Sequence, residues 1–157
     1  MPPTWVTHRQ LPAMNFMSGK CFVDTNVLVY VYDLSAGVKC SRAQELTSEL
    51  WDLRKGVVST QVLQELYIAL RRRLKIPVSI ADASGIVRDY FEWEVVINGR
   101  DSIIRAAELE ARYKISFWDG LILQAAELAG ADLMYSEDLS HGQIYGNVKV
   151  LNPFTDS

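Results

Sequence analysis

Short apolar runs alternate along the chain with longer segments whose apolar residues recur every three or four positions. The short runs, at residues 20–23, 57–59, 94–97, 132–135 and 148–151, are typical of buried strands. The longer segments predict a helix directly after Asp24 and further helices over 41–55, 61–74, 79–91, 101–113 and 117–129. Strands that alternate with amphipathic helices favour an α/β fold, a three-layer α/β/α sandwich with a mostly parallel central sheet.

The chain has 157 residues, which is enough to enclose one hydrophobic core and leaves little for a second. Residues 1–19 contain Pro2, Pro3 and Pro12 and show no sustained period, so they predict an irregular N-terminal arm. Met14 and Met17 are candidate alternative starts within this arm. We therefore expect one folded domain over residues 20–157.

Composition and charge exclude several classes of protein. The two cysteines, Cys21 and Cys40, lack the paired spacing of a zinc site or a disulfide framework, and they are expected to be buried or half-buried thiols in a reducing compartment. No apolar stretch is long enough to cross a bilayer or to form a signal peptide, so we expect a cytoplasmic protein without a membrane partner. The formal charge of −3 means that a nucleic acid would have to be bound by a local basic patch or by metal ions.

Four acidic residues lie at or near predicted junctions of strand and helix, and each has a simple structural explanation when taken alone. Asp24 suits the N-cap of the helix that follows it. Ser116 and Asp119 have the spacing of a capping box, in which the acid reaches back to the cap. Asp138 follows a strand, where turns commonly use aspartate, and Glu65 lies beside the apolar stripe of its helix, where a solvated glutamate is common.

The same four acids can also converge on one site. Ligands of open α/β sheets bind at the carboxyl ends of the strands, and this is where Asp24 and Asp138 are predicted to lie. Carboxylates gathered there repel one another. A divalent cation such as Mg²⁺, which prefers oxygen ligands, is the usual resolution.

Four segments of the chain resemble the PIN-domain family of metal-dependent nucleases, and within it the toxins of the VapC type. The matching segments are FVDTNVL at 22–28, STQVLQE at 59–65, ISFWD at 115–119 and YSEDLSHGQ at 135–143. They occur in the family's order, and the resemblance covers residues 21–154. The sequence departs from the family pattern at Gly120, where alanine is common.

The resemblance implies a site of four acids, with three polar residues that orient them or bound water. The acids are Asp24, Glu65, Asp119 and Asp138; the supporting residues are Thr25, Asn26 and Ser136. Asp24 and Asp119 are expected to bind the metal directly, whereas Asp138 and Glu65 bind it directly or through water. The cofactor would be Mg²⁺ or Mn²⁺, and the reaction would be hydrolysis of RNA phosphodiesters.

An acidic site needs basic groups at its rim to attract RNA. The densest basic cluster consists of Arg71, Arg72, Arg73 and Lys75, which are candidate RNA contacts. A solvated helix end, where cations suit the helix dipole, explains this cluster equally well. Trp118 and Tyr145 are candidate surfaces on which an unpaired base could stack.

The family resemblance further implies a small antitoxin protein as partner and a homodimer. The leading hypothesis is thus a metal-dependent endoribonuclease that acts as the toxin of a toxin–antitoxin pair. Two alternatives stay open: a PIN nuclease that processes RNA without being a toxin, and a binding module that keeps the fold without catalysis.

Overall fold

The computed structural model describes residues 19–155 of the chain, so the predicted N-terminal arm lies outside the described residues apart from Gly19. Elements follow one another in the order β1 (Cys21–Val23), α1 (Thr25–Tyr32), η1 (Leu34–Ala36), α2 (Val38–Leu53), β2 (Gly56–Ser59), α3 (Thr60–Arg72), α4 (Ile80–Asp89), η2 (Tyr90–Glu92), β3 (Glu94–Val96), α5 (Arg100–Tyr113), α6 (Phe117–Ala129), β4 (Leu133–Tyr135), β5 (Ile144–Tyr145) and β6 (Val148–Leu151). The elements η1 and η2 are single turns of 3₁₀ helix.

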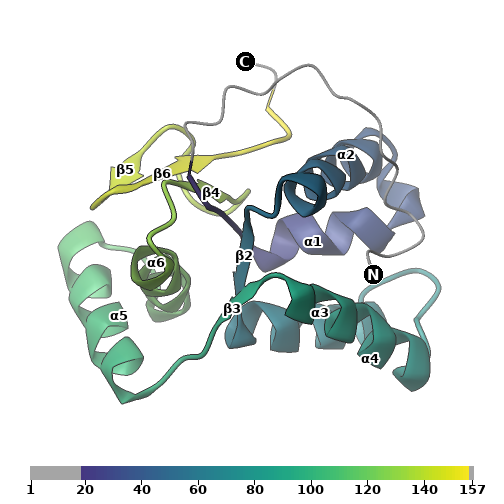
Figure 1. The fold of residues 1–157 in the computed structure, drawn as a ribbon, viewed down its shortest axis with the longest axis horizontal. Helices are drawn as coiled ribbons and strands as arrows, with labels where there is room; N and C mark the ends of the chain where they lie inside the picture. Colours follow the sequence, from purple (N-terminus) through teal and green to yellow (C-terminus); the bar gives the residue numbers. More distant parts are fainter. Residues whose placement is uncertain (1–18, 156–157) are drawn as a thin grey trace.

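In the described part of the chain, six strands form one sheet in the order β3-β2-β1-β4-β6-β5. All neighbouring strands are parallel except β5, which runs antiparallel to β6. Helices α5 and α6 lie on one side of this sheet and α1 to α4 on the other (Figure 1). The predicted α/β fold with a mostly parallel central sheet is confirmed.

The core lies between the sheet and the two helical layers, and it explains why the predicted runs are strands and helices. All three residues of β1 and all four of β2 are buried, as expected for parallel strands covered on both faces. Helices α1 and α3 each bury one apolar stripe. The largest fully buried side chains are Tyr90, Phe22, Leu28, Leu46, Leu50, Leu66, Leu70, Leu109, Leu123 and Met134.

Strand order creates a switch point between β1 and β4. From β1 the chain moves outward to β2 and β3, and it returns later to place β4 on the opposite side of β1. Val23 pairs with Tyr135, and the backbone N–H of Asp24 donates to the Tyr135 carbonyl at 2.9 Å. The residues that follow β1 and β4 are therefore side by side at the carboxyl edge of the sheet, where α/β proteins bind ligands.

Several helix boundaries follow from capping residues. The Ser59 side chain caps α3 by accepting from the Val62 N–H, and Ser79 caps α4 by accepting from the Asp82 N–H. Gly130 ends α6 at φ 70°, a left-handed conformation that glycine adopts without strain. The predicted helix 79–91 is in fact α4 followed by the turn η2, and α2 begins at Val38, about one turn before its predicted start.

Two further expectations concern the cysteines and the membrane. Cys21 and Cys40 are both buried and free, as predicted. Within residues 19–155, no helix has the length and apolar character needed to cross a membrane.

Candidate active site

Asp24 lies at the centre of the site, directly after β1. Its side chain is 5% exposed, and Oδ1 caps α1 by accepting the Thr25 N–H at 2.7 Å. Oδ2 accepts from the Ser136 hydroxyl at 2.8 Å and from the Asn26 amide at 3.4 Å. Asp24 is thus an N-cap, and its second oxygen faces polar groups of the neighbouring strand end.

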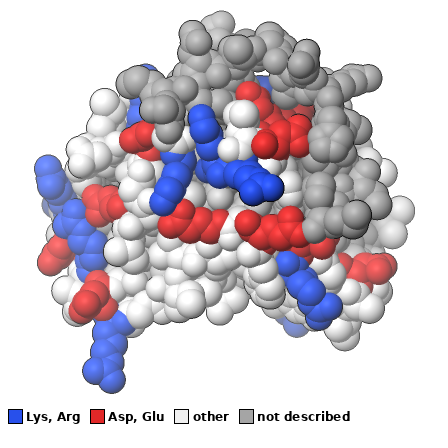
Figure 2. All heavy atoms as spheres, in the orientation of Figure 1, with Lys and Arg blue, Asp and Glu red and all other residues white. Residues whose placement is uncertain are grey.

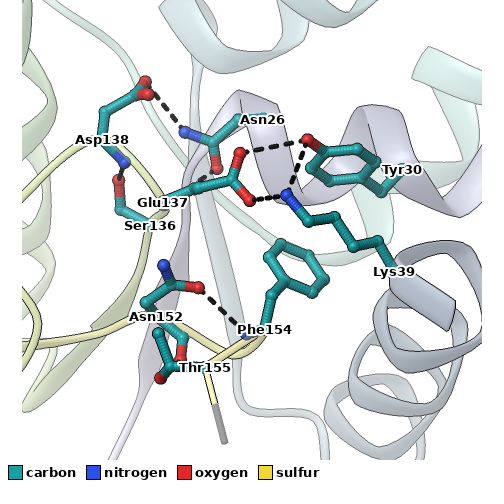
Figure 3. A network of polar contacts seen from close by, with 9 residues as sticks. All are labelled: Asn26, Tyr30, Lys39, Ser136, Glu137, Asp138, Asn152, Phe154 and Thr155. Atoms are coloured by element: carbon teal, nitrogen blue, oxygen red, sulfur yellow. Dashed lines mark hydrogen bonds and ion pairs between the residues drawn. The ribbon is translucent and has the colours of Figure 1, made fainter. Parts of the chain in front are cut away.

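Asn26 and Ser136 join Asp24 to Asp138, which enters the site on the turn after β4. Figure 3 shows the contacts of these two residues with Asp138. The Asn26 amide nitrogen donates to Asp138 Oδ2 at 2.9 Å as well as to Asp24. The Ser136 hydroxyl oxygen accepts the Asp138 N–H at 3.1 Å. Glu137 N–H donates to Asn26 Oδ1 at 3.3 Å, so the turn is fixed at three consecutive residues.

Glu65 reaches the site from α3. Its Oε2 accepts from the Thr25 hydroxyl at 2.6 Å, and its Oε1 accepts from the Gln61 amide at 3.0 Å. Gln61 is one helical turn before Glu65 and is buried, and its amide also lies 3.5 Å from the Trp118 carbonyl. Gln61 therefore connects Glu65 to the start of α6.

Asp119 enters from the first turn of α6. Its N–H donates to the Ser116 hydroxyl at 3.0 Å, which confirms Ser116 as the helix cap. Burial, together with the charges of Asp138 and Glu65, raises the pKa of Asp119, while a hydrogen bond with Ser116 lowers it. Asp119 thus lies within the electrostatic reach of two of the other three acids.

Asp24 carries the strongest electrostatic signal of the site. Burial, helped by the charges of Asp138 and Glu65 and opposed by hydrogen bonds from Ser136 and Thr25, raises the pKa of Asp24 to about 7. Acids whose pKa is perturbed by burial and by like charges, in a cleft, are typical of functional sites. The ionised form of this cluster is unfavourable unless a cation joins it.

The donor set fits a hard divalent cation in its chemistry, since it consists of carboxylate oxygens with amide and hydroxyl groups behind them. The geometry is incomplete: within residues 19–155, no three or more His, Cys, Asp and Glu side chains stand in an arrangement that could hold a metal ion. Around an ion the acids would have to draw closer than they lie here.

The four predicted basic residues have different surroundings. Arg71 donates to the Val78 carbonyl at 2.9 Å, and Arg72 and Lys75 are exposed. Arg73 is the one that lines the same pocket as Asp24, Glu65 and Asp138. On the face of the molecule in Figure 2, positive and negative side chains are interspersed. An RNA bound on this face would therefore depend on individual basic side chains rather than on one broad positive surface.

The two aromatic candidates also differ. Trp118, adjacent to Asp119 in the chain, is 63% exposed. Tyr145 is 3% exposed and packs its ring edge against Tyr113, with 5.0 Å between ring centroids. It is not available to stack on a base, because it is part of the small strand β5 and of the core.

Sequence reasoning missed two features of the site. Gln61 has a sequence signal, since residues four apart on a helix lie on the same face and Gln61 precedes Glu65 by four. The contacts of Glu137 have no signal in the sequence. Its carboxylate accepts from Lys39 of α2 at 2.6 Å and from the Tyr30 hydroxyl of α1 at 3.0 Å (Figure 3).

Comparison with solved structures shows the same fold in two bacterial proteins. One is VapC20 of Mycobacterium tuberculosis, described as a sarcin–ricin loop cleaving toxin, with a TM-score of 0.60, 22% identity, and coverage of 76% of this chain and 90% of that one. The other is a toxin–antitoxin complex from Klebsiella pneumoniae, with a TM-score of 0.63, 18% identity, and coverage of 86% and 98%. No curated protein sequence matches this chain significantly.

A sequence model of one protein family covers most of the chain. The model describes the PIN domain, and the match extends over residues 21–147, from β1 to just beyond β5. It includes all four acids of the site and the three polar residues that support them. This chain belongs to the PIN-domain family.

Proposed function

We propose that this protein is a metal-dependent endoribonuclease and that Asp24, Glu65, Asp119 and Asp138 form its active site. One observation carries the proposal. A buried carboxylate, Asp24, whose pKa is raised to about 7, lies at the switch point of the sheet within the electrostatic influence of Glu65 and Asp138. A buried acid beside two other acids costs stability when it is ionised and unpaired, which supports a role in binding a cation in addition to capping α1.

We assign two roles to the residues of the site: metal binding and orientation of the metal ligands. Asp24 and Asp119 would hold Mg²⁺ or Mn²⁺ directly, with Asp138 and Glu65 as direct or water-mediated ligands. When bound, such an ion polarises the phosphate and lowers the pKa of a bound water. Thr25 and Gln61 hold the two oxygens of Glu65, while Asn26 and Ser136 hold Asp138 and Asp24, so the acids keep their orientation as substrate enters.

RNA as substrate and an antitoxin as partner are supported by the relatives. The Mycobacterium protein of the same fold is described as a toxin that cleaves the sarcin–ricin loop, and the Klebsiella protein is part of a toxin–antitoxin complex. We infer that this protein is likewise a toxin that acts on RNA in the cytoplasm, that a small antitoxin neutralises it, and that it forms a homodimer.

Cleavage of total RNA tests this proposal. Purified protein is incubated with total RNA in Mg²⁺, Mn²⁺ or EDTA beside an Asp119→Asn variant, whose isosteric amide removes the charge. Cleavage that needs the metal and is lost in the variant is the expected result. A folded protein that binds neither Mn²⁺ in calorimetry nor RNA would overturn the proposal and favour a binding module.

Expression in cells separates a toxin from an RNA-processing nuclease. Wild-type protein should arrest growth, and Asp24→Asn or Asp119→Asn should relieve the arrest at equal protein level. RNA cleavage in the test tube without growth arrest would favour the processing nuclease.

A further inference from the structure

One pocket of about 270 Å³ joins three of the four acids to groups that metal binding does not explain. Val29, Tyr30 and Arg73 line it together with Asp24, Glu65 and Asp138. This volume lies just under the range of pockets that enclose a whole small-molecule ligand, about 300 to 1,000 Å³. It suits one unit of a longer chain better than a complete ligand.

Arg73 brings a positive charge into this pocket from the end of α3, two turns beyond Glu65. Its backbone N–H donates to the Ala69 carbonyl, which fixes the residue as the helix cap. Within residues 19–155, its guanidinium forms neither a hydrogen bond nor an ion pair with any of the neighbouring acids. The group is therefore available to an anion, and its planar fork matches the oxygens of a phosphate.

Tyr30 forms an aromatic wall of the pocket, and its ring is held in place by three neighbours (Figure 3). The hydroxyl donates to Glu137 Oε1 at 3.0 Å, and the Lys39 ammonium lies 5.0 Å from the ring centroid. Phe154 meets the ring edge to face, with 5.0 Å between centroids. A ring fixed in this way loses little conformational entropy when a ligand packs against it.

A cation, an aromatic wall and three acids thus line one small pocket. We propose that Arg73 and Tyr30 form a subsite for one nucleotide of the RNA chain next to the scissile phosphate. Arg73 binds the phosphate of that nucleotide, and Tyr30 with Val29 contacts its sugar and base. A ring against which a base packs requires that base to be unpaired, so the subsite selects single-stranded or looped RNA. This inference rests on the proposed nuclease function.

Binding of labelled RNA to a non-cleaving protein tests the subsite directly. A fluorescent single-stranded oligoribonucleotide is titrated with the Asp119→Asn protein, alone and combined with Arg73→Gln, Arg73→Lys, Tyr30→Ala or Tyr30→Phe, at several salt concentrations. Arg54→Gln serves as the matched control. It also removes one arginine charge, but from the turn between α2 and β2 at the opposite edge of the sheet.

The variants have distinct expected results. Arg73→Gln should weaken binding about tenfold and lower the salt slope by about 0.7, because one contact to a single-stranded phosphate is lost. Arg73→Lys should keep the salt slope and recover part of the affinity. Tyr30→Ala should weaken binding about tenfold with an unchanged salt slope, and Tyr30→Phe should bind like the parent because the ring remains. A duplex of the same sequence should bind more weakly and respond less to Tyr30→Ala.

Two outcomes overturn the inference, and they are distinguishable. If the wild type cleaves RNA with metal, but Arg73→Gln and Tyr30→Ala match Arg54→Gln in affinity and salt slope, the subsite is refuted and the nuclease stands. If the wild type neither cleaves nor binds RNA, the proposed function fails and the subsite with it. The melting temperature of each variant, compared with that of the parent protein, shows whether a loss of binding comes from a loss of fold.

Discussion

The Thr25 hydroxyl donates a 2.6 Å hydrogen bond to Oε2 of Glu65. It links the first residue of α1 to the second turn of α3, 40 residues further along the chain. Glu65 is exposed, and an exposed glutamate on a helix normally samples several rotamers. Thr25 and Gln61 together restrict it to the edge of the acidic cluster.

Loss of the Thr25 hydroxyl should therefore impair catalysis without unfolding the protein. Thr25→Val keeps the shape of the side chain and removes the charged hydrogen bond, so kcat/KM for RNA should fall about tenfold. Thr25→Ser, which keeps the hydroxyl, should retain most of the activity. Steady-state cleavage and Mn²⁺ titration calorimetry measure both effects, and a Thr25→Val protein that cleaves RNA as fast as the wild type would show that the hydroxyl is not needed.

Asp24 should make the metal-free protein less stable as pH rises. Its pKa is 3.8 when unperturbed and about 7 in the folded protein, so between these values the folded state holds a proton that the unfolded state has lost. The unfolded state thus binds fewer protons, and the free energy of unfolding falls from about pH 4 to about pH 7, by at most roughly 4 kcal/mol. Urea unfolding in EDTA across this range measures the slope.

Two variants and one ligand refine this measurement. Asp24→Asn should flatten the pH dependence and be more stable than the wild type at pH 8. Mg²⁺ should raise the melting temperature of the wild type more at pH 8 than at pH 5, because only the ionised acids bind it. A wild type whose stability in EDTA is constant from pH 4 to pH 8 would contradict the burial of an ionisable Asp24.

The positions of the acids were predictable because the signals that place them are local. Asp24 follows an apolar run and precedes a helical period, and Ser116 and Asp119 have the spacing of a capped helix start. Each of these signals spans only a few residues, and each is confirmed by a hydrogen bond of the backbone or the cap. The turn after β4 is set in the same way by Ser136 and Asp138.

Features that depend on distant segments were not predictable. Strand β5 has two residues and, among the described residues, pairs with β6 alone, so no period marks it. Tyr145, a candidate for base stacking by sequence, is buried there. The four basic residues after Glu65 look equivalent in the sequence. Only the orientation of the end of α3 and its following loop separates Arg73, in the pocket, from Arg71, which binds a backbone carbonyl.

Gly120 should be required for the packing of α6 against α5. A Cβ atom at this position would lie 2.6 Å from the backbone carbonyl oxygen of Ala106, and backbone cannot move aside as a side chain can. Gly120→Ala should therefore destabilise the protein by about 1–3 kcal/mol, despite the better helix propensity of alanine. Gly85→Ala is the control, because nothing lies within 4 Å of its Cβ in α4, and it should stabilise by about 0.5–1 kcal/mol. Urea unfolding that shows both variants equally stable would mean that α5 and α6 can separate at no cost.

Lys39 should influence cleavage although it lies outside the acidic cluster. Its ammonium lies 2.6 Å from Glu137 Oε2, and Glu137 is the middle residue of the turn that carries Ser136 and Asp138. Both partners are partly exposed, so the ion pair itself adds little to stability, at most about 1 kcal/mol. Its larger effect is on position, because the Glu137 carboxylate has only Lys39 and Tyr30 as side-chain partners among the described residues.

Lys39→Met should accordingly lower kcat several-fold while the melting temperature changes by only a few degrees, and Lys39→Arg should recover most of the activity. Arg105→Met is the matched control. It breaks a two-pronged ion pair with Glu127 between α5 and α6, which is part of neither the acidic cluster nor its pocket, so cleavage should persist at the wild-type rate. If Lys39→Met and Arg105→Met lose activity equally, or only in proportion to their loss of stability, then the turn holds Asp138 in place without Lys39, through Asn26 and Ser136 alone.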